Sequence, residues 1–110
     1  MSTTATKKLT KAKLVKFFED YLKPFGEEVG TSWDGYPNVV VMTTHEAKKS
    51  YDYTGGKFHV IFESSWIYGA INFPETPEDW EFETLFTEFL KEHGMYYGRG
   101  TNYNFNIYND

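Results

Sequence analysis

The sequence has no cysteine, and this absence excludes disulfide bonds, thiolate catalysis and cysteine-ligated zinc. Arginine is nearly absent as well, because Arg99 is the only arginine among 11 basic residues. No apolar run comes near the roughly 18 residues that a membrane-spanning helix needs. The polar start of the chain lacks the apolar stretch of a secretory signal, so we expect a cytoplasmic protein without a membrane partner.

Leucine and alanine are also scarce, and aromatic residues take their place. The chain of 110 residues contains 10 Phe, 9 Tyr and 3 Trp, which together make up 20% of it. A bias toward Lys, Asn, Tyr and Phe is typical of AT-rich coding, as in the small accessory genes of phages and mobile elements. The length predicts one domain. We expect residues 1–8 to form a disordered polar tail and residues 9–110 to form a single compact domain.

The first helix is predicted from an apolar stripe with a period of 3.6 residues. Thr10 is a suitable N-cap, and Leu9 and Leu14 are spaced for a hydrophobic staple. Pro24 and Gly26 predict that the helix ends near them. The stripe consists of Leu14, Phe17, Phe18, Tyr21, Leu22 and Phe25.

A second helix is predicted in the last third of the chain. Thr76 precedes Pro77 and two acidic residues, which is the pattern of an N-cap, a proline in the first turn and carboxylates at the positive end of the helix. Gly94 is the expected stop. The apolar stripe of this helix consists of Phe82, Leu85, Phe86, Phe89, Leu90 and His93.

Strands are predicted between and after the two helices. The β-branched and alternating segments are 39–44, a pair 51–53 and 58–63 around Gly55 and Gly56, a strand at 66–73, and a closing strand at 102–108, with a short first strand at 29–33. Residues 64–65 form a turn and 98–100 a loop in this prediction. In the closing strand, Tyr103, Phe105 and Ile107 should face one side, and Asn104 and Asn106 the other.

These elements predict an α+β fold in two layers. It consists of an antiparallel sheet of four to five strands with two amphipathic helices, in the order α-β-β-β-(β)-α-β. We expect the closing strand to be able to lie at a sheet edge and pair with a second copy, so a homodimer stays open.

The sequence offers little for catalysis. The three histidines are His45, His59 and His93; we expect His59 to be a surface residue of a strand and His93 to interact with the negative end of the second helix. No spacing matches a metal site, and no nucleophile motif is present. We therefore expect no enzymatic activity, no cofactor and no metal, while an enzyme that uses His59 or His93 with nearby acids is the less favoured alternative.

One face of the second helix is the most informative surface. Glu81, Glu88 and Glu92 lie within about 40° of one another around the helix, and Trp80 points almost opposite the apolar stripe, near Thr84. Tryptophan is enriched at interface hot spots. The competing interpretation is that the glutamates are simply solvated and that Trp80 covers a neighbouring loop. The predicted partner-binding residues are Trp80, Glu81, Thr84, Glu88, Glu92, Tyr96, Tyr97 and Arg99.

We expect a small protein that binds and inhibits another protein stoichiometrically. Phage anti-defence and host-takeover factors belong to this class, and the acidic helix would suit a target with a basic nucleic-acid-binding groove. An immunity protein against a toxin is one alternative. The other is a nucleic-acid-binding accessory protein. Its contacts would be Lys7, Lys8, Lys11, Lys13 and Lys16, with Tyr51, Tyr53, Tyr68 and Tyr103 stacking on bases.

Overall fold

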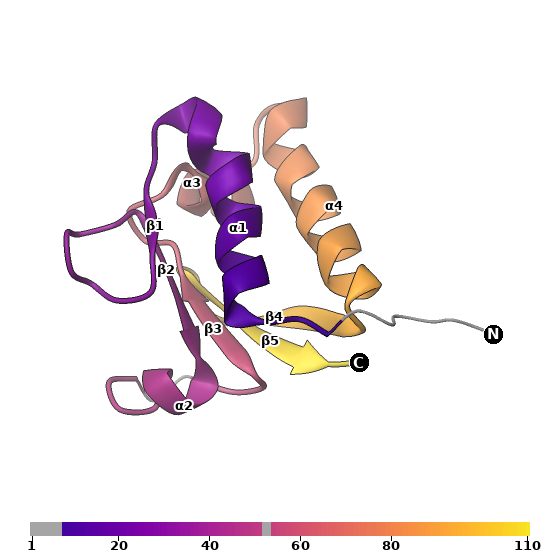
Figure 1. The fold of residues 1–110 in the computed structure, drawn as a ribbon. Coiled ribbons are helices and arrows are strands. Elements are labelled where there is room, and N and C mark those ends of the chain that lie inside the picture. The colour runs from indigo at the N-terminus through magenta and orange to yellow at the C-terminus, as the bar shows by residue number, and fades with distance from the viewer. Residues whose placement is uncertain (1–7, 52–53) are drawn as a thin grey trace.

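The fold is known from a computed structural model, which describes residues 8–51 and 54–110. In this part of the chain, four α-helices and a short 3₁₀ helix surround a five-stranded sheet (Figure 1). The predicted tail, residues 1–8, lies outside the described residues except for Lys8, which is exposed. The elements are α1 (Lys11–Leu22), η1 (Lys23–Phe25), β1 (Val29–Gly30), β2 (Val39–Thr43), α2 (Thr44–Ala47), β3 (Phe58–Ile61), α3 (Trp66–Asn72), α4 (Pro77–Glu92), β4 (Met95–Thr101) and β5 (Asn104–Asn109).

The sheet has the strand order β1-β2-β3-β5-β4. Only β1 and β2 are parallel, and all other neighbours are antiparallel. The predicted α+β class is confirmed, and the sheet is mixed rather than purely antiparallel. The closing strand β5 does not lie at an edge, because it pairs with both β3 and β4; that expectation was wrong. Its residues Asn104–Ile107 are buried on both faces, as in an interior strand, and β4 forms the edge.

Both predicted amphipathic helices are confirmed, together with their ends. The Thr10 hydroxyl accepts a hydrogen bond from the Lys13 N–H, and Gly26 ends η1 with a φ of 69°. At the start of α4, the Asp79 carboxylate accepts a hydrogen bond from the Thr76 N–H at 2.9 Å. Gly94 follows α4 with a φ of 68°. These caps satisfy some of the backbone groups that every helix end leaves unpaired.

The segment predicted as a strand at 66–73 is a helix instead, α3. Ser65 is its N-cap and accepts a hydrogen bond from the Ile67 N–H at 3.1 Å. The Glu27 carboxylate, far away in sequence, accepts hydrogen bonds from the Ser65 hydroxyl at 2.6 Å and from the Trp66 N–H at 2.7 Å. These tertiary contacts stabilise a helix in a segment whose bulky residues favour a strand by local propensity.

Several other element bounds differ from the prediction. The strand expected at 39–44 ends at Thr43, because Thr43 and Glu46 form a capping box that begins α2. The loop expected at 98–100 belongs to β4, and the strand expected at 29–33 is limited to β1. Within the segment predicted as a strand at 51–53, Tyr51 lies in no strand, and residues 52–53 lie outside the described part of the chain.

The main core lies between the sheet and the layer formed by α1, α3 and α4. Figure 1 shows α1 and α4 side by side on the same face of the sheet. Phe86 of α4 is in ring contact with Phe18 of α1 at 5.3 Å and with Phe105 of β5 at 5.1 Å between centroids. Aromatic rings thus take the positions that aliphatic residues fill in most cores, as the composition indicated.

The opposite face of the sheet has a smaller core covered by α2. Its buried residues are Val40, Met42, Ala47 and Ile61, with Tyr51 and Tyr103 packed against them. The predicted alternation of β5 is confirmed for Phe105 and Ile107, which lie in the main core. Tyr103 differs, because it precedes the strand and packs on the smaller core.

Candidate functional site

The charge of the protein is concentrated in α4. This helix contains six acidic residues and one lysine, so its net charge of −5 equals the net charge of the whole chain. The ten acidic residues elsewhere are balanced by ten basic ones. A negative surface that belongs to one helix, rather than to the whole molecule, is the kind of charge distribution that steers a positively charged partner to one place.

Only two of the α4 carboxylates have structural roles. Asp79 caps the helix by accepting hydrogen bonds from the Glu75 and Thr76 N–H groups. These hydrogen bonds lower the pKa of the Asp79 carboxyl below its ordinary value. Glu83 accepts a hydrogen bond from the Tyr97 hydroxyl at 2.8 Å. Within residues 8–51 and 54–110, the other four make no ion pair and no side-chain hydrogen bond. They are Glu78, Glu81, Glu88 and Glu92, and all four are exposed.

The exposed face of α4 has two flanks. Trp80 is 58% exposed and lies about 100° around the helix from Glu81. Leu85, which is 41% exposed, lies on the same side as Glu81, Glu88 and Glu92. Trp80 and the glutamates, which are all predicted partner-binding residues, therefore lie on different flanks of this exposed face.

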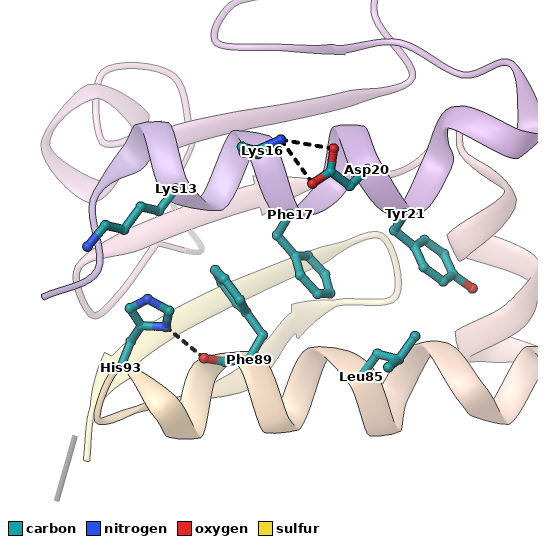
Figure 2. A pocket seen from close by; sticks show the side chains of 8 residues that line it. All are labelled: Lys13, Lys16, Phe17, Asp20, Tyr21, Leu85, Phe89 and His93. Carbon is teal, nitrogen blue, oxygen red and sulfur yellow. Dashed lines mark hydrogen bonds and ion pairs between the residues drawn. The ribbon is translucent and has the colours of Figure 1, made fainter. Parts of the chain in front are cut away.

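The glutamate flank borders a groove between α1 and α4 of about 500 Å³, shown in Figure 2. Its floor is aromatic, since the rings of Phe17 and Phe89 stack with centroids 4.6 Å apart. The α1 side carries the ion pair of Lys16 and Asp20, at 3.1 Å. The groove is lined by Lys13, Lys16, Phe17, Asp20, Tyr21, Leu85, Phe89 and His93. It offers apolar contact between two charged rims.

Tyr21 marks the acidic end of this groove. Burial raises the pKa of its hydroxyl above the ordinary range, and the nearby carboxylates of Glu81, Asp79 and Glu78 raise it further. The first turns of α4 therefore place their negative charge against the Tyr21 end. At the other end, the groove is lined by Lys13 and His93. A partner that enters the groove meets opposite charges at its two ends.

The three predicted partner-binding residues of β4 lie in different surroundings. Tyr97 is half-buried beneath α4, and its ring contacts Phe86 at 5.2 Å. Burial, and then the Glu83 carboxylate, raise the pKa of the Tyr97 hydroxyl. Tyr96 is 51% exposed and stacks on Tyr108. The Arg99 guanidinium donates a hydrogen bond to the Asn72 side-chain oxygen at 2.6 Å. The structure thus does not bring these three side chains into one patch.

The histidines are also apart from one another. His59 is fully buried on the α2 face of the sheet, so the expectation of a surface residue was wrong. The loop that follows α2 covers it, with the Tyr51 ring stacked at 5.5 Å. His93 is the C-cap of α4 and its Nδ1 is 2.8 Å from the Phe89 carbonyl, at the helix end as predicted. His45 is exposed on α2. In the described residues, no group of three His, Asp or Glu side chains is arranged to hold a metal ion.

The residues of the nucleic-acid alternative are dispersed as well. Lys11 pairs with Glu46 at 3.1 Å, and Lys13 donates to the Lys8 carbonyl at 2.8 Å. Lys16 pairs with Asp20, and Lys7 lies outside the described residues. Tyr51 and Tyr103 pack on the smaller core, Tyr68 belongs to α3, and Tyr53 is outside the described part of the chain. Tyr51 and Tyr103 thus lie on the opposite side of the sheet from the lysines of α1.

The groove was not predicted, because Phe17, Leu85 and Phe89 belong to the apolar stripes that a core is expected to bury. The available signal was the width of the α4 stripe, which extends about 140° around the helix from Leu85 to Leu90. Leu85, at one margin of this stripe, is 41% exposed.

No described helix is long and apolar enough to cross a membrane. Comparisons with protein-family models, with curated proteins and with solved structures find nothing that matches this chain.

Proposed function

We propose that this protein binds another protein stoichiometrically and inhibits it, with the glutamate flank of α4 and the adjoining groove as its contact surface. The observation that carries the proposal is the set of four exposed carboxylates without partners in the described chain, next to the exposed Leu85 and an aromatic groove. Apolar groups flanked by unpaired charge are typical of a specific interface, because the apolar part supplies affinity and the charge supplies orientation.

The target is a protein with a basic surface, and a nucleic-acid-binding groove suits α4 best. A helix of 16 residues is about 24 Å long, so its five net charges give roughly one charge every 5 Å. One strand of DNA carries a charge about every 3.4 Å. The helix therefore presents a line of negative charge whose density approaches that of a nucleic-acid strand, on a rigid element.

An inhibitor of this kind acts in the cytoplasm, where proteins that handle nucleic acids are found. It fits the small accessory proteins with which phages and mobile elements counter host defence or take over host functions. An immunity protein that neutralises a nuclease toxin would use the same chemistry, since the active groove of such a toxin is also basic. The identity of the captured protein distinguishes these two cases.

The test is capture of the target from a nuclease-treated lysate of the native host, with the tagged full chain as bait. One protein should be recovered in near-equal amount. A triple variant, Glu81→Lys, Glu88→Lys and Glu92→Lys, should lose it while its circular dichroism stays unchanged, because all three side chains are exposed.

The matched control reverses three exposed carboxylates outside α4. These are Glu28, Glu63 and Glu75. This control variant has the same net charge as the α4 variant, so it should still capture the target. Equal capture by both variants, or equal loss by both, contradicts a role for the α4 flank.

A further inference from the structure

The edge strand β4 has backbone groups that no described residue satisfies. The Asp110 N–H donates to the Gly94 carbonyl at 2.9 Å, which fixes the phase of the β4–β5 ladder. In an antiparallel ladder, alternate residues exchange their backbone hydrogen bonds with the neighbouring strand. Tyr96 and Gly98 therefore bond to β5, while the N–H and C=O groups of Met95, Tyr97 and Arg99 point away from the sheet.

This edge lacks the usual protection against pairing. Natural edge strands are shortened, or carry proline or lysine, or are covered by another element. The opposite edge strand, β1, has only two residues, whereas β4 has seven. Its one charged side chain, Arg99, is held by Asn72, and its bulge lies at the far end, between Arg99 and Thr101. Residues 95–99 thus form a regular and open edge.

The free groups of β4 are self-complementary. The three outward residues are evenly spaced about Tyr97. A two-fold axis at Tyr97 would pair Tyr97 with itself, and Met95 with Arg99 of a second copy, in both directions. Every outward N–H and C=O of residues 95–99 then finds a partner, which is what an isologous dimer interface requires.

The helix next to this edge presents its less acidic flank. Thr87 and Lys91 of α4 line a hollow of about 360 Å³ with Met95 and Tyr97 of β4. Trp80 lies on the same flank, within about 20° of both Thr87 and Lys91 around the helix. Glu83 is the carboxylate nearest to this side, and it is bonded to the Tyr97 hydroxyl. Trp80 is exposed and makes no ring contact among the described residues. Its position on this flank therefore places it beside the open edge.

We propose that two copies of this chain associate through β4, forming one continuous sheet with the two α4 helices side by side. Glu83 and Phe86 contact Tyr97, so an axis at Tyr97 passes near the middle of α4. The axis brings Trp80 of each copy toward Lys91 of the other copy. A lysine ammonium over an indole ring is a favourable cation–π pair. Glu81, Glu88 and Glu92 lie on the other flank, so the dimer leaves them free. The proposal stands independently of the proposed function.

Two measurements on the full chain test this dimer. Light scattering after gel filtration should give a mass that rises with concentration toward twice 12.9 kDa. Residue-resolved hydrogen exchange should show the Tyr97 and Arg99 amides protected at high concentration, with exchange about tenfold slower than at low concentration. The Tyr96 and Gly98 amides, which are bonded to β5, should be protected at both concentrations.

Variants on the α4 flank identify the surface. Lys91→Glu should return the mass to that of one chain, because it sets a carboxylate against the Trp80 ring. Lys23→Glu makes the same change at an exposed residue of η1 and should leave the dimer intact. A single-chain mass at every concentration overturns the proposal. A dimer in which the Tyr97 and Arg99 amides exchange freely overturns it as well.

Discussion

His59 of β3 and Asn106 of β5 lie opposite each other in the sheet, and their side chains are joined by a hydrogen bond of 2.7 Å. His59 Nδ1 donates to the Asn106 side-chain oxygen, which leaves Nε2 without a proton in the neutral ring. Nε2 faces the Asn104 side-chain amide at 3.5 Å, and that amide group is a donor. A second ring proton would therefore point at a donor in a fully buried site.

This arrangement predicts that the fold becomes less stable as the pH is lowered. Burial lowers the pKa of His59 below its ordinary value of 6.5, although the bond to Asn106 opposes the shift. As the pH falls below about 6.5, His59 becomes protonated in the unfolded chain, while in the folded chain it stays neutral to lower pH. The free energy of unfolding should then decrease by up to about 1.4 kcal/mol per pH unit. Urea unfolding at several pH values between about 7.5 and 5.5, within the range in which histidine titrates, measures this slope.

His59→Gln should remove this slope, because glutamine does not titrate. His45→Gln is the matched control, since His45 is exposed, and it should keep the slope of the natural chain. A slope that persists in the His59 variant would assign the effect to another group.

Glu27 is predicted to stabilise α3. Its carboxylate accepts hydrogen bonds from the Ser65 hydroxyl and the Trp66 N–H, and bonds to a charged acceptor are the stronger kind. Glu27→Ala should lower the free energy of unfolding by about 2 kcal/mol. The neighbouring Glu28 is exposed, so Glu28→Ala should change it by less than about 0.5 kcal/mol. Urea unfolding followed by tryptophan fluorescence compares them; equal effects would contradict the role of Glu27.

The same contact explains where sequence reasoning about the fold was wrong. Helices α1 and α4 were predictable, because their caps and their apolar stripes are local patterns. The start of α3 is bonded to Glu27, which precedes its N-cap by 38 residues, and no local pattern reports such a contact. The burial of His59 has the same origin, since Tyr51 and the loop after α2 cover it.

Gly56 and Gly26 make a matched pair for a test of close packing. Both have positive φ, 70° and 69°, so alanine is strained at each by about 1–2 kcal/mol. A Cβ at Gly56 would also collide with the Ile107 carbonyl, whereas a Cβ at Gly26 meets nothing within 4 Å. Gly56→Ala should therefore cost about 2 kcal/mol more than Gly26→Ala in thermal or urea unfolding. Equal costs would mean that the segment at Gly56 moves away from β5.

Part of the candidate site could be predicted from the sequence. The alignment of Glu81, Glu88 and Glu92 follows from helix geometry alone. The separation of Tyr96 from Tyr97 follows only once residues 95–101 are known to be a strand, because adjacent strand residues point to opposite faces. What the sequence could not show is that one side of α4 borders a groove with α1 and the other a hollow beside β4.

The nucleic-acid alternative is tested by retention on a DNA column at low salt. The ion pairs of Lys11 and Lys16 are worth only about 0–1 kcal/mol, so phosphates could displace them. The net charge of −5 decides against binding, since α4 repels the phosphate backbone and Arg99 is engaged with Asn72. We expect the full chain to pass through the column.

Retention that falls steeply with salt would contradict this expectation. A second variant then locates the contact. If Lys7→Gln with Lys8→Gln abolishes retention and the α4 triple variant does not alter it, the basic start of the chain binds phosphate and the glutamates only solvate the helix. Reversing the three α4 charges changes the net charge from −5 to about +1. If the α4 triple variant is retained and the natural chain is not, the natural glutamates are what repels nucleic acid.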